Sequence, residues 1–145
     1  MYNRIVLAYD GSEMGREALL GCREIAELTL AEIFLIAVLP PAMEVASGEA
    51  VVDLSRFEDE ERMRFRAILD DGVKRLAALG HAVRGELGCG DAIREICGYA
   101  TRVEADLIVV GHRHREGWAN RWWRMSVSKS LIELSPCNVL IVITT

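Results

Sequence analysis

The sequence is poor in proline, has no long apolar run and carries fewer basic than acidic residues, and each of these features excludes a class of protein. Three prolines in 145 residues, beside 51% apolar and 27% charged residues, exclude a fibrous or disordered chain. No apolar run approaches the roughly 20 residues that a membrane helix needs, so no membrane partner is expected. Seventeen basic against twenty-two acidic residues disfavour binding to nucleic acid through its phosphates. Because the first residues also lack the layout of a signal peptide, we expect a globular, cytoplasmic protein.

The cysteines and histidines do not form the spacings of a metal site. No C-x-x-C pair is present, and the cysteines stand in or beside apolar segments, which favours reduced and buried thiols. His112 and His114 can share a face of an extended segment, but no third ligand is nearby, whereas structural zinc needs four. We therefore expect no bound metal at these residues. The four cysteines are Cys22, Cys89, Cys97 and Cys137.

The sequence also lacks the usual signatures of an enzyme. It has no G-x-S-x-G elbow, no P-loop and no H-E-x-x-H segment. Ser12, Ser126 and Ser128 have no evident histidine and aspartate partners for nucleophilic catalysis. The carboxylates at 58–61 fit a solvated helix face better than an acid–base pair. We expect a protein without catalytic residues.

Five short runs rich in Val, Ile and Leu predict the strands of one sheet. Such near-continuous apolar runs are typical of strands that are buried on both faces of a parallel sheet. They are RIVLAY at 4–9, EIFLIAVL at 32–39, the weaker HAVRGEL at 81–87, DLIVV at 106–110 and NVLIVIT at 138–144.

Four helical patterns alternate with these runs. Ser12, Asp91 and Ser126 are placed to cap three of the helices, and the longest runs from near Leu54 to Gly80. The alternation predicts an α/β fold, an open, doubly wound parallel sheet with helices on both faces, in a single domain over residues 1–145. The residues expected to face the sheet are Ala18, Cys22, Ile25, Ala26, Phe65, Ile68, Leu69, Val73, Leu76, Ile93, Ile96, Cys97, Ala100, Val127, Leu131 and Leu134.

Ligands of such sheets bind at the carboxyl ends of the strands, where the strand order reverses. The turn after the first strand is Asp-Gly-Ser, and Gly111 follows the fourth strand. Asp10 can accept a hydrogen bond from an adenine amino group or a ribose hydroxyl. The other interpretation is that Asp10 only shapes the Asp-Gly turn and the start of the first helix.

Three stretches in the right order and spacing resemble the universal stress protein family. They are IVLAYDGSEMGREAL, ADLIVVGHRH and SVSKSLIELSPCNVLIV, and the resemblance covers essentially the whole chain. The resemblance implies a five-stranded sheet ordered 3-2-1-4-5, so that Asp10 and Gly111 face one crevice at the switch point. It also implies that Asp10, with Gly11 and Ser12, lies on the adenine side and that Val38 lines the adenine pocket.

The resemblance implies ATP or AMP, with Mg, as the ligand, but the phosphate loop departs from the family pattern. Members that bind these nucleotides carry a glycine after strand four, then two residues, a second glycine, about nine further residues, and Gly-Ser or Gly-Thr at the start of the last helix. Gly111 matches the first glycine and Ser126 the hydroxyl, whereas His114 and Met125 replace the other two glycines. A side chain forced into a strained backbone costs on the order of 1–3 kcal/mol, so each replacement should weaken binding.

Arginine side chains in the same loop can supply donors to phosphate in place of the lost backbone contacts. They are Arg113, Arg115, Arg121 and Arg124. The predicted nucleotide-binding residues are Asp10, Gly11, Ser12, Val38, Gly111, Arg113, His114, Ser126, Val127 and Ser128.

Two further features predict protein partners. Trp122 and Trp123 are adjacent and cannot both be core, and Trp and Arg concentrate in the centres of interfaces, which favours a protein contact over a platform for bases. The last strand, Asn138 to Thr144, lies at the sheet edge in the family order and implies a homodimer. We expect a homodimeric stress-response protein that acts by association; the alternatives are an interaction module that uses the tryptophan loop and a slow ATP hydrolase.

Overall fold

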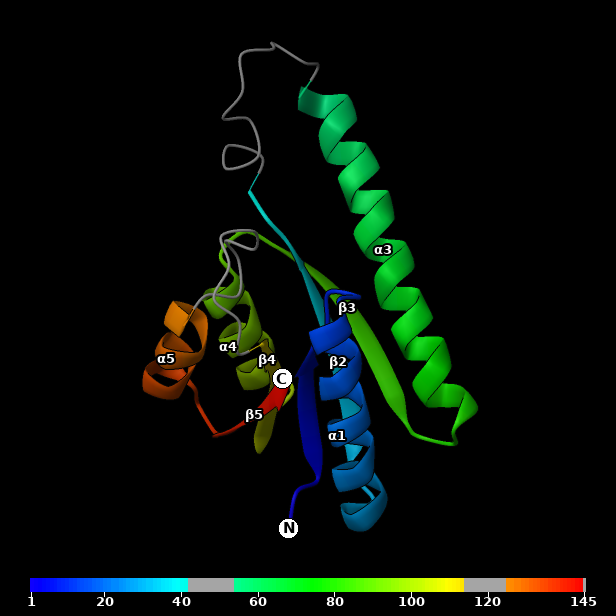
Figure 1. The fold of residues 1–145 in the computed structure, drawn as a ribbon, viewed down its shortest axis with the longest axis vertical. Helices are drawn as coiled ribbons and strands as arrows, with labels where there is room; N and C mark the ends of the chain where they lie inside the picture. Colours follow the sequence, from blue (N-terminus) through cyan, green and yellow to red (C-terminus); the bar gives the residue numbers. More distant parts are fainter. Residues whose placement is uncertain (42–53, 114–124, 145) are drawn as a thin grey trace.

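The chain folds into a five-stranded, fully parallel sheet with the order β3-β2-β1-β4-β5, which confirms the predicted doubly wound α/β fold (Figure 1). The computed structural model describes residues 1–41, 54–113 and 125–144. The reversal of strand order lies between β1 and β4, where Leu7 pairs with Val109. The strands are β1 Arg4–Ala8, β2 Glu32–Leu39, β3 Val83–Cys89, β4 Leu107–Arg113 and β5 Asn138–Thr144.

Two helices cover each face of the sheet, and the strand residues alternate between the two layers (Figure 1). Ile5 and Leu7 of β1 pack under α1 and α3, whereas Val6 and Ala8 pack under α4 and α5. All four are at most 4% exposed, since successive side chains of a strand point to opposite faces. This double burial explains why the strands are apolar without interruption. The helices are α1 Glu13–Thr29, α3 Leu54–Ala78, α4 Ala92–Arg102 and α5 Met125–Leu134.

The helix caps predicted at Ser12 and Asp91 are confirmed. The Ser12 hydroxyl accepts a hydrogen bond from the backbone N–H of Gly15, and the Asp91 carboxylate accepts one from that of Arg94. The cap predicted at Ser126 is wrong, because α5 already begins at Met125 and places Ser126 in its first turn. None of the helices in the described ranges combines the length and the apolar character that a membrane span requires.

Two predictions of burial are wrong, both at the ends of elements. Leu134 is the last residue of α5, where the chain leaves toward β5, and its side chain is 64% exposed. Cys89 is exposed because it ends β3, an edge strand. Cys22 is buried as predicted, and burial raises the pKa of its thiol to about 12, so it stays protonated in the folded protein. Cys97 and Cys137 are half-buried.

Candidate functional site

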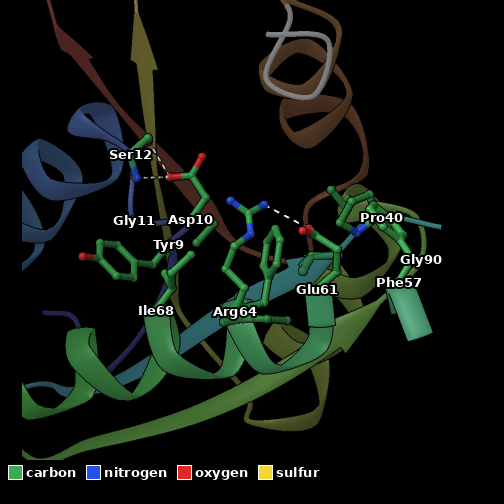
Figure 2. A pocket seen from close by; sticks show the side chains of 15 residues that line it. Tyr9, Asp10, Gly11, Ser12, Pro40, Phe57, Glu61, Arg64, Ile68 and Gly90 are labelled. Carbon is green, nitrogen blue, oxygen red and sulfur yellow. Dashed lines mark hydrogen bonds and ion pairs between the residues drawn. The ribbon is translucent and has the colours of Figure 1, made fainter. Parts of the chain in front are cut away.

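A pocket of about 610 Å³ opens at the carboxyl ends of β1 and β2 and extends along the first turns of α3 (Figure 2). Sheets of this class bind ligands at their carboxyl edge, and the volume is in the range of small-molecule sites. Among the described residues, the pocket lies on the β2 side of β1, whereas the strand order reverses on its β4 side. Asp10, Gly11, Ser12 and Val38, four of the predicted site residues, line it. The other lining residues are Ala8, Tyr9, Ile36, Pro40, Phe57, Glu61, Arg64, Phe65, Ile68, Gly90 and Ala92.

Asp10 takes part in the turn and also lines the pocket. Its Oδ1 accepts hydrogen bonds from the backbone N–H of Ser12 at 2.9 Å and from the Ser12 hydroxyl at 2.5 Å. Ser12 in turn caps α1 through Gly15 at 3.1 Å. A Cβ on Gly15 would lie 2.8 Å from Oδ1, so this glycine leaves room for the carboxylate above the helix. Oδ2 makes none of these bonds, and the two interpretations of Asp10 are therefore compatible.

Gly11 is fixed by both its backbone and its neighbour. Its φ of +75° lies in the left-handed region that side chains rarely adopt, and an added Cβ would lie 3.0 Å from Cγ2 of Ile68. The turn after β1 therefore touches α3 directly. This contact closes the floor of the pocket between the two elements.

One face of α3 forms the outer wall of the pocket. Phe57, Glu61, Arg64, Phe65 and Ile68 follow one another at helical spacing, which places them on the same side of the helix. The Arg64 guanidinium pairs with the Glu61 carboxylate at 3.0 Å, and its central carbon lies 5.2 Å from the centroid of the Phe65 ring. Glu61 was predicted to lie on a solvated helix face with its neighbouring carboxylates. In the structure it lines the pocket instead, and its side chain is only 24% exposed.

Sequence reasoning missed this helical wall, although the signal was present. Phe65 and Ile68 were predicted to face the sheet, and the same stripe continues toward the N-terminus through Glu61 and Phe57. Polar residues on that extension interrupt the apolar pattern, so the stripe ended too early in the prediction. Where a helix extends beyond the end of the sheet, its sheet-facing stripe borders a cavity and no longer packs on strands.

Gly72 brings α3 close to the sheet below the pocket. A Cβ at this position would lie 2.7 Å from Cδ2 of Leu35 and 2.9 Å from Cε1 of Tyr9. Tyr9 itself lines the pocket and is 2% exposed. Because position 72 has no side chain, α3 can lie this close to the strands. Gly72 therefore also sets the width of the pocket.

The sequence as a whole matches one known family. A model of the universal stress protein family matches residues 1–142. The chain belongs to the universal stress protein family. It is 30% identical over 148 residues to universal stress protein YxiE of Bacillus subtilis, with 98% of this chain and 99% of the relative covered.

Solved structures of universal stress proteins share the fold. A family protein from Burkholderia pseudomallei superposes with a TM-score of 0.77 at 26% identity and covers 97% of this chain and 96% of its own. A universal stress protein family protein from Arabidopsis thaliana, solved with AMP bound, has a TM-score of 0.73 at 17% identity and covers 99% of this chain and 92% of its own. At that identity, the second likeness concerns the fold alone.

The β4 side of this universal stress protein differs from the sequence prediction in one respect. Gly111 does not follow the strand but lies buried within β4, paired with Val142 of β5, and the strand continues to Arg113. Gly111 is not among the described residues that line the pocket. The strand continues because β5 offers pairing partners as far as Thr144.

Several predicted positions cannot be placed in the site. His114, Trp122 and Trp123 lie outside the described residues, as do Arg115, Arg121 and Arg124. α5 places the backbone of Ser126, Val127 and Ser128 in its first turn, but these side chains and that of Arg113 also lie outside the description. Their roles in binding phosphate, and the partner surface at the tryptophans, stay predictions. Within the described ranges, no three His, Cys, Asp or Glu side chains are grouped to hold a metal ion.

Proposed function

We propose that this universal stress protein binds an adenine nucleotide, ATP or AMP, in the pocket between the β1 turn and α3, and that it acts by ligand-dependent association in the cytoplasm. The observation that carries the proposal is the pocket itself, with Asp10 at the sheet's switch point and Val38 beside it. The AMP complex of the Arabidopsis relative shows that a protein of this fold accommodates such a ligand.

The lining suits the base of a nucleotide better than its phosphates. Ile36, Val38 and Pro40 line the pocket together with the aromatic residues of α3, and a purine is a flat, largely apolar group. The charged lining residues are Asp10, Glu61 and Arg64, so the described part of the pocket carries a formal charge of −1. A phosphate would be repelled there. We place the phosphates and any Mg instead toward the β4–α5 side, at Gly111, Arg113, His114 and Ser126–Ser128.

We further propose that the protein has no catalytic role. Ser12 is the only hydroxyl-bearing serine or threonine among the described lining residues, and it is engaged on both sides. Its hydroxyl donates to Asp10 and accepts from Gly15, which keeps it in the turn. The competing proposal, slow ATP hydrolysis, requires metal-dependent release of phosphate that disappears in Asp10→Ala.

Titration of the wild-type protein with ATP, AMP and cyclic AMP in a calorimeter tests the binding proposal. We expect saturable heat with one site per chain for at least ATP or AMP, and a higher melting temperature, because a ligand that binds only the folded state stabilises it. GTP and CTP serve as controls for the base. Neither heat nor a thermal shift at millimolar nucleotide would contradict the proposal.

A homodimer through β5 is the assembly that we propose. β5 is an edge strand, and an uncovered apolar edge pairs readily with another chain. Its Ile143 is 62% exposed, and Ile132 of the neighbouring helix α5 is 63% exposed. Two copies that meet edge to edge would cover these side chains in an interface of two-fold symmetry.

Ile143→Lys is expected to shift the protein from dimer toward monomer, because it places a charge in the proposed interface. Sedimentation velocity over a range of concentrations measures the shift. Leu28→Lys is the matched control, since Leu28 lies on α1 and is 82% exposed. A wild-type protein that sediments as a monomer, or an Ile143→Lys variant that dimerises as the wild type does, would exclude this interface.

A further inference from the structure

Arg64 is the one cation among the described residues of the pocket, and it is held in a defined place. Figure 2 shows its side chain rising from α3 with the guanidinium directed toward Asp10 at the end of β1. Glu61 holds one edge of the guanidinium at 3.0 Å. The Phe65 ring lies beneath it, 5.2 Å from ring centroid to guanidinium carbon. Two neighbours on the same helix thus orient a planar cation at the pocket wall.

A planar cation in this position has a specific use. Guanidinium groups stack on aromatic rings, and a purine presents a π-face whatever its substituents. The side chain of Arg64 is 62% exposed, so part of its surface remains open beside the ring of Phe65. Val38 and Pro40 also line the pocket and add apolar surface for a flat ligand.

We propose that Arg64 is a nucleotide-binding residue that stacks on the base, and that Glu61 is a positioning residue that holds the guanidinium in the stacking orientation. The inference rests on the proposed function and extends it to a helix from which the sequence pattern predicted no ligand contact. Stacking, in contrast to an ionic contact with phosphate, adds the same increment of affinity to adenosine, AMP and ATP. An equal gain in affinity for all three ligands therefore distinguishes stacking on the base from a contact with phosphate.

Arg64→Met tests the inference, because methionine keeps the apolar stem and removes the planar cation. We expect binding of adenosine, AMP and ATP to weaken by the same factor, about tenfold, as for a cation–π contact that is partly shielded from water. Arg64→Lys should restore little of the loss, since an ammonium has no plane to stack. Arg66→Met removes the same charge from an exposed position of α3 that does not line the pocket, and should bind as the wild type does.

Glu61→Gln tests the positioning role. We expect a loss of about threefold in the wild-type background, the size of a partly exposed ion pair, and no loss in the Arg64→Met background. A role of Glu61 in stability alone would give the same change in both backgrounds. That result would overturn the positioning role.

Three outcomes would count against these proposals, and they differ in which proposal they refute. A wild-type protein that binds none of the three ligands refutes both. A wild-type protein that binds them, with an Arg64→Met variant of equal affinity, refutes the stacking role alone. A loss confined to AMP and ATP, restored by Arg64→Lys and reduced by salt, would identify Arg64 as a phosphate contact and overturn stacking.

Discussion

Replacing Gly72 with valine is expected to lower the free energy of unfolding by about 3 kcal/mol, the upper end of what overpacking a closed core usually costs. Its Cβ alone would lie 2.7 Å from Leu35 and 2.9 Å from Tyr9, and these neighbours are 0% and 2% exposed, so the clash falls within the packed core. Valine is a better helix former than glycine by only about 0.4 kcal/mol, which does not offset the clash. Chemical denaturation of the two proteins measures the difference.

Gly98→Val is the matched control for this prediction. Gly98 lies in α4, and the nearest atom to an added Cβ is a guanidinium nitrogen of Arg102 at 3.6 Å, an ordinary contact with a flexible side chain. We expect its stability to stay within about 0.5 kcal/mol of the wild type. Equal effects at the two glycines would show that helix propensity, and not the approach of α3 to the sheet, governs both.

The clash at Gly72 also predicts a coupling with Leu35. Leu35→Ala alone is expected to destabilise by about 2–5 kcal/mol, because it opens a cavity in a fully buried layer. In the double variant the new valine methyl groups occupy part of that cavity. The loss should therefore be smaller than the sum of the two single losses, and an additive double variant would contradict the contact between them.

Asp10→Ala is expected to weaken binding of ATP or AMP by about tenfold to a hundredfold, the range for loss of a hydrogen bond to a charged group. The substitution removes the carboxylate that lines the pocket at the end of β1. It also removes the acceptor of two hydrogen bonds from Ser12, so a small loss of stability should accompany the loss of affinity. Calorimetric titration and thermal unfolding measure the two effects separately.

Asp10→Asn separates the turn from the ligand contact. An amide oxygen can still accept the hydrogen bond from the backbone N–H of Ser12, so stability should be close to that of the wild type, whereas the charge is lost. We expect about fivefold weaker binding, between those of wild type and Asp10→Ala. Asp70→Ala, an exposed change on α3 away from the pocket, should alter neither. Full affinity in both Asp10 variants would leave Asp10 with its role in the turn only.

The fold was accessible to sequence reasoning because its signals are local. β1, β2 and β5 are runs rich in Val, Ile and Leu, and Ser12 and Asp91 cap helices through hydrogen bonds within four residues. The sequence predictions failed where the position of an adjacent strand determines the structure. β4 runs past Gly111 because β5 continues beside it, and Cys89 is exposed because β3 is the edge strand of the sheet that the described residues form. The place of a strand in the sheet cannot be derived from the sequence of that strand alone.

The candidate site divides in the same way. Asp10, Gly11 and Ser12 follow the first apolar run and Val38 lies near the end of the second, so the sequence by itself assigned them to the carboxyl edge of the sheet, and the structure places all four around the pocket. Only the tertiary structure added the opposite wall. Glu61 and Arg64 lie more than fifty residues from Asp10 in the sequence, yet all three line one pocket. They come together because α3 packs closely against the sheet at Gly72 and against the β1 turn at Gly11, where a side chain would clash. Strand periodicity is a property of a short segment, whereas the meeting of a helix face and a strand end depends on packing across the whole fold.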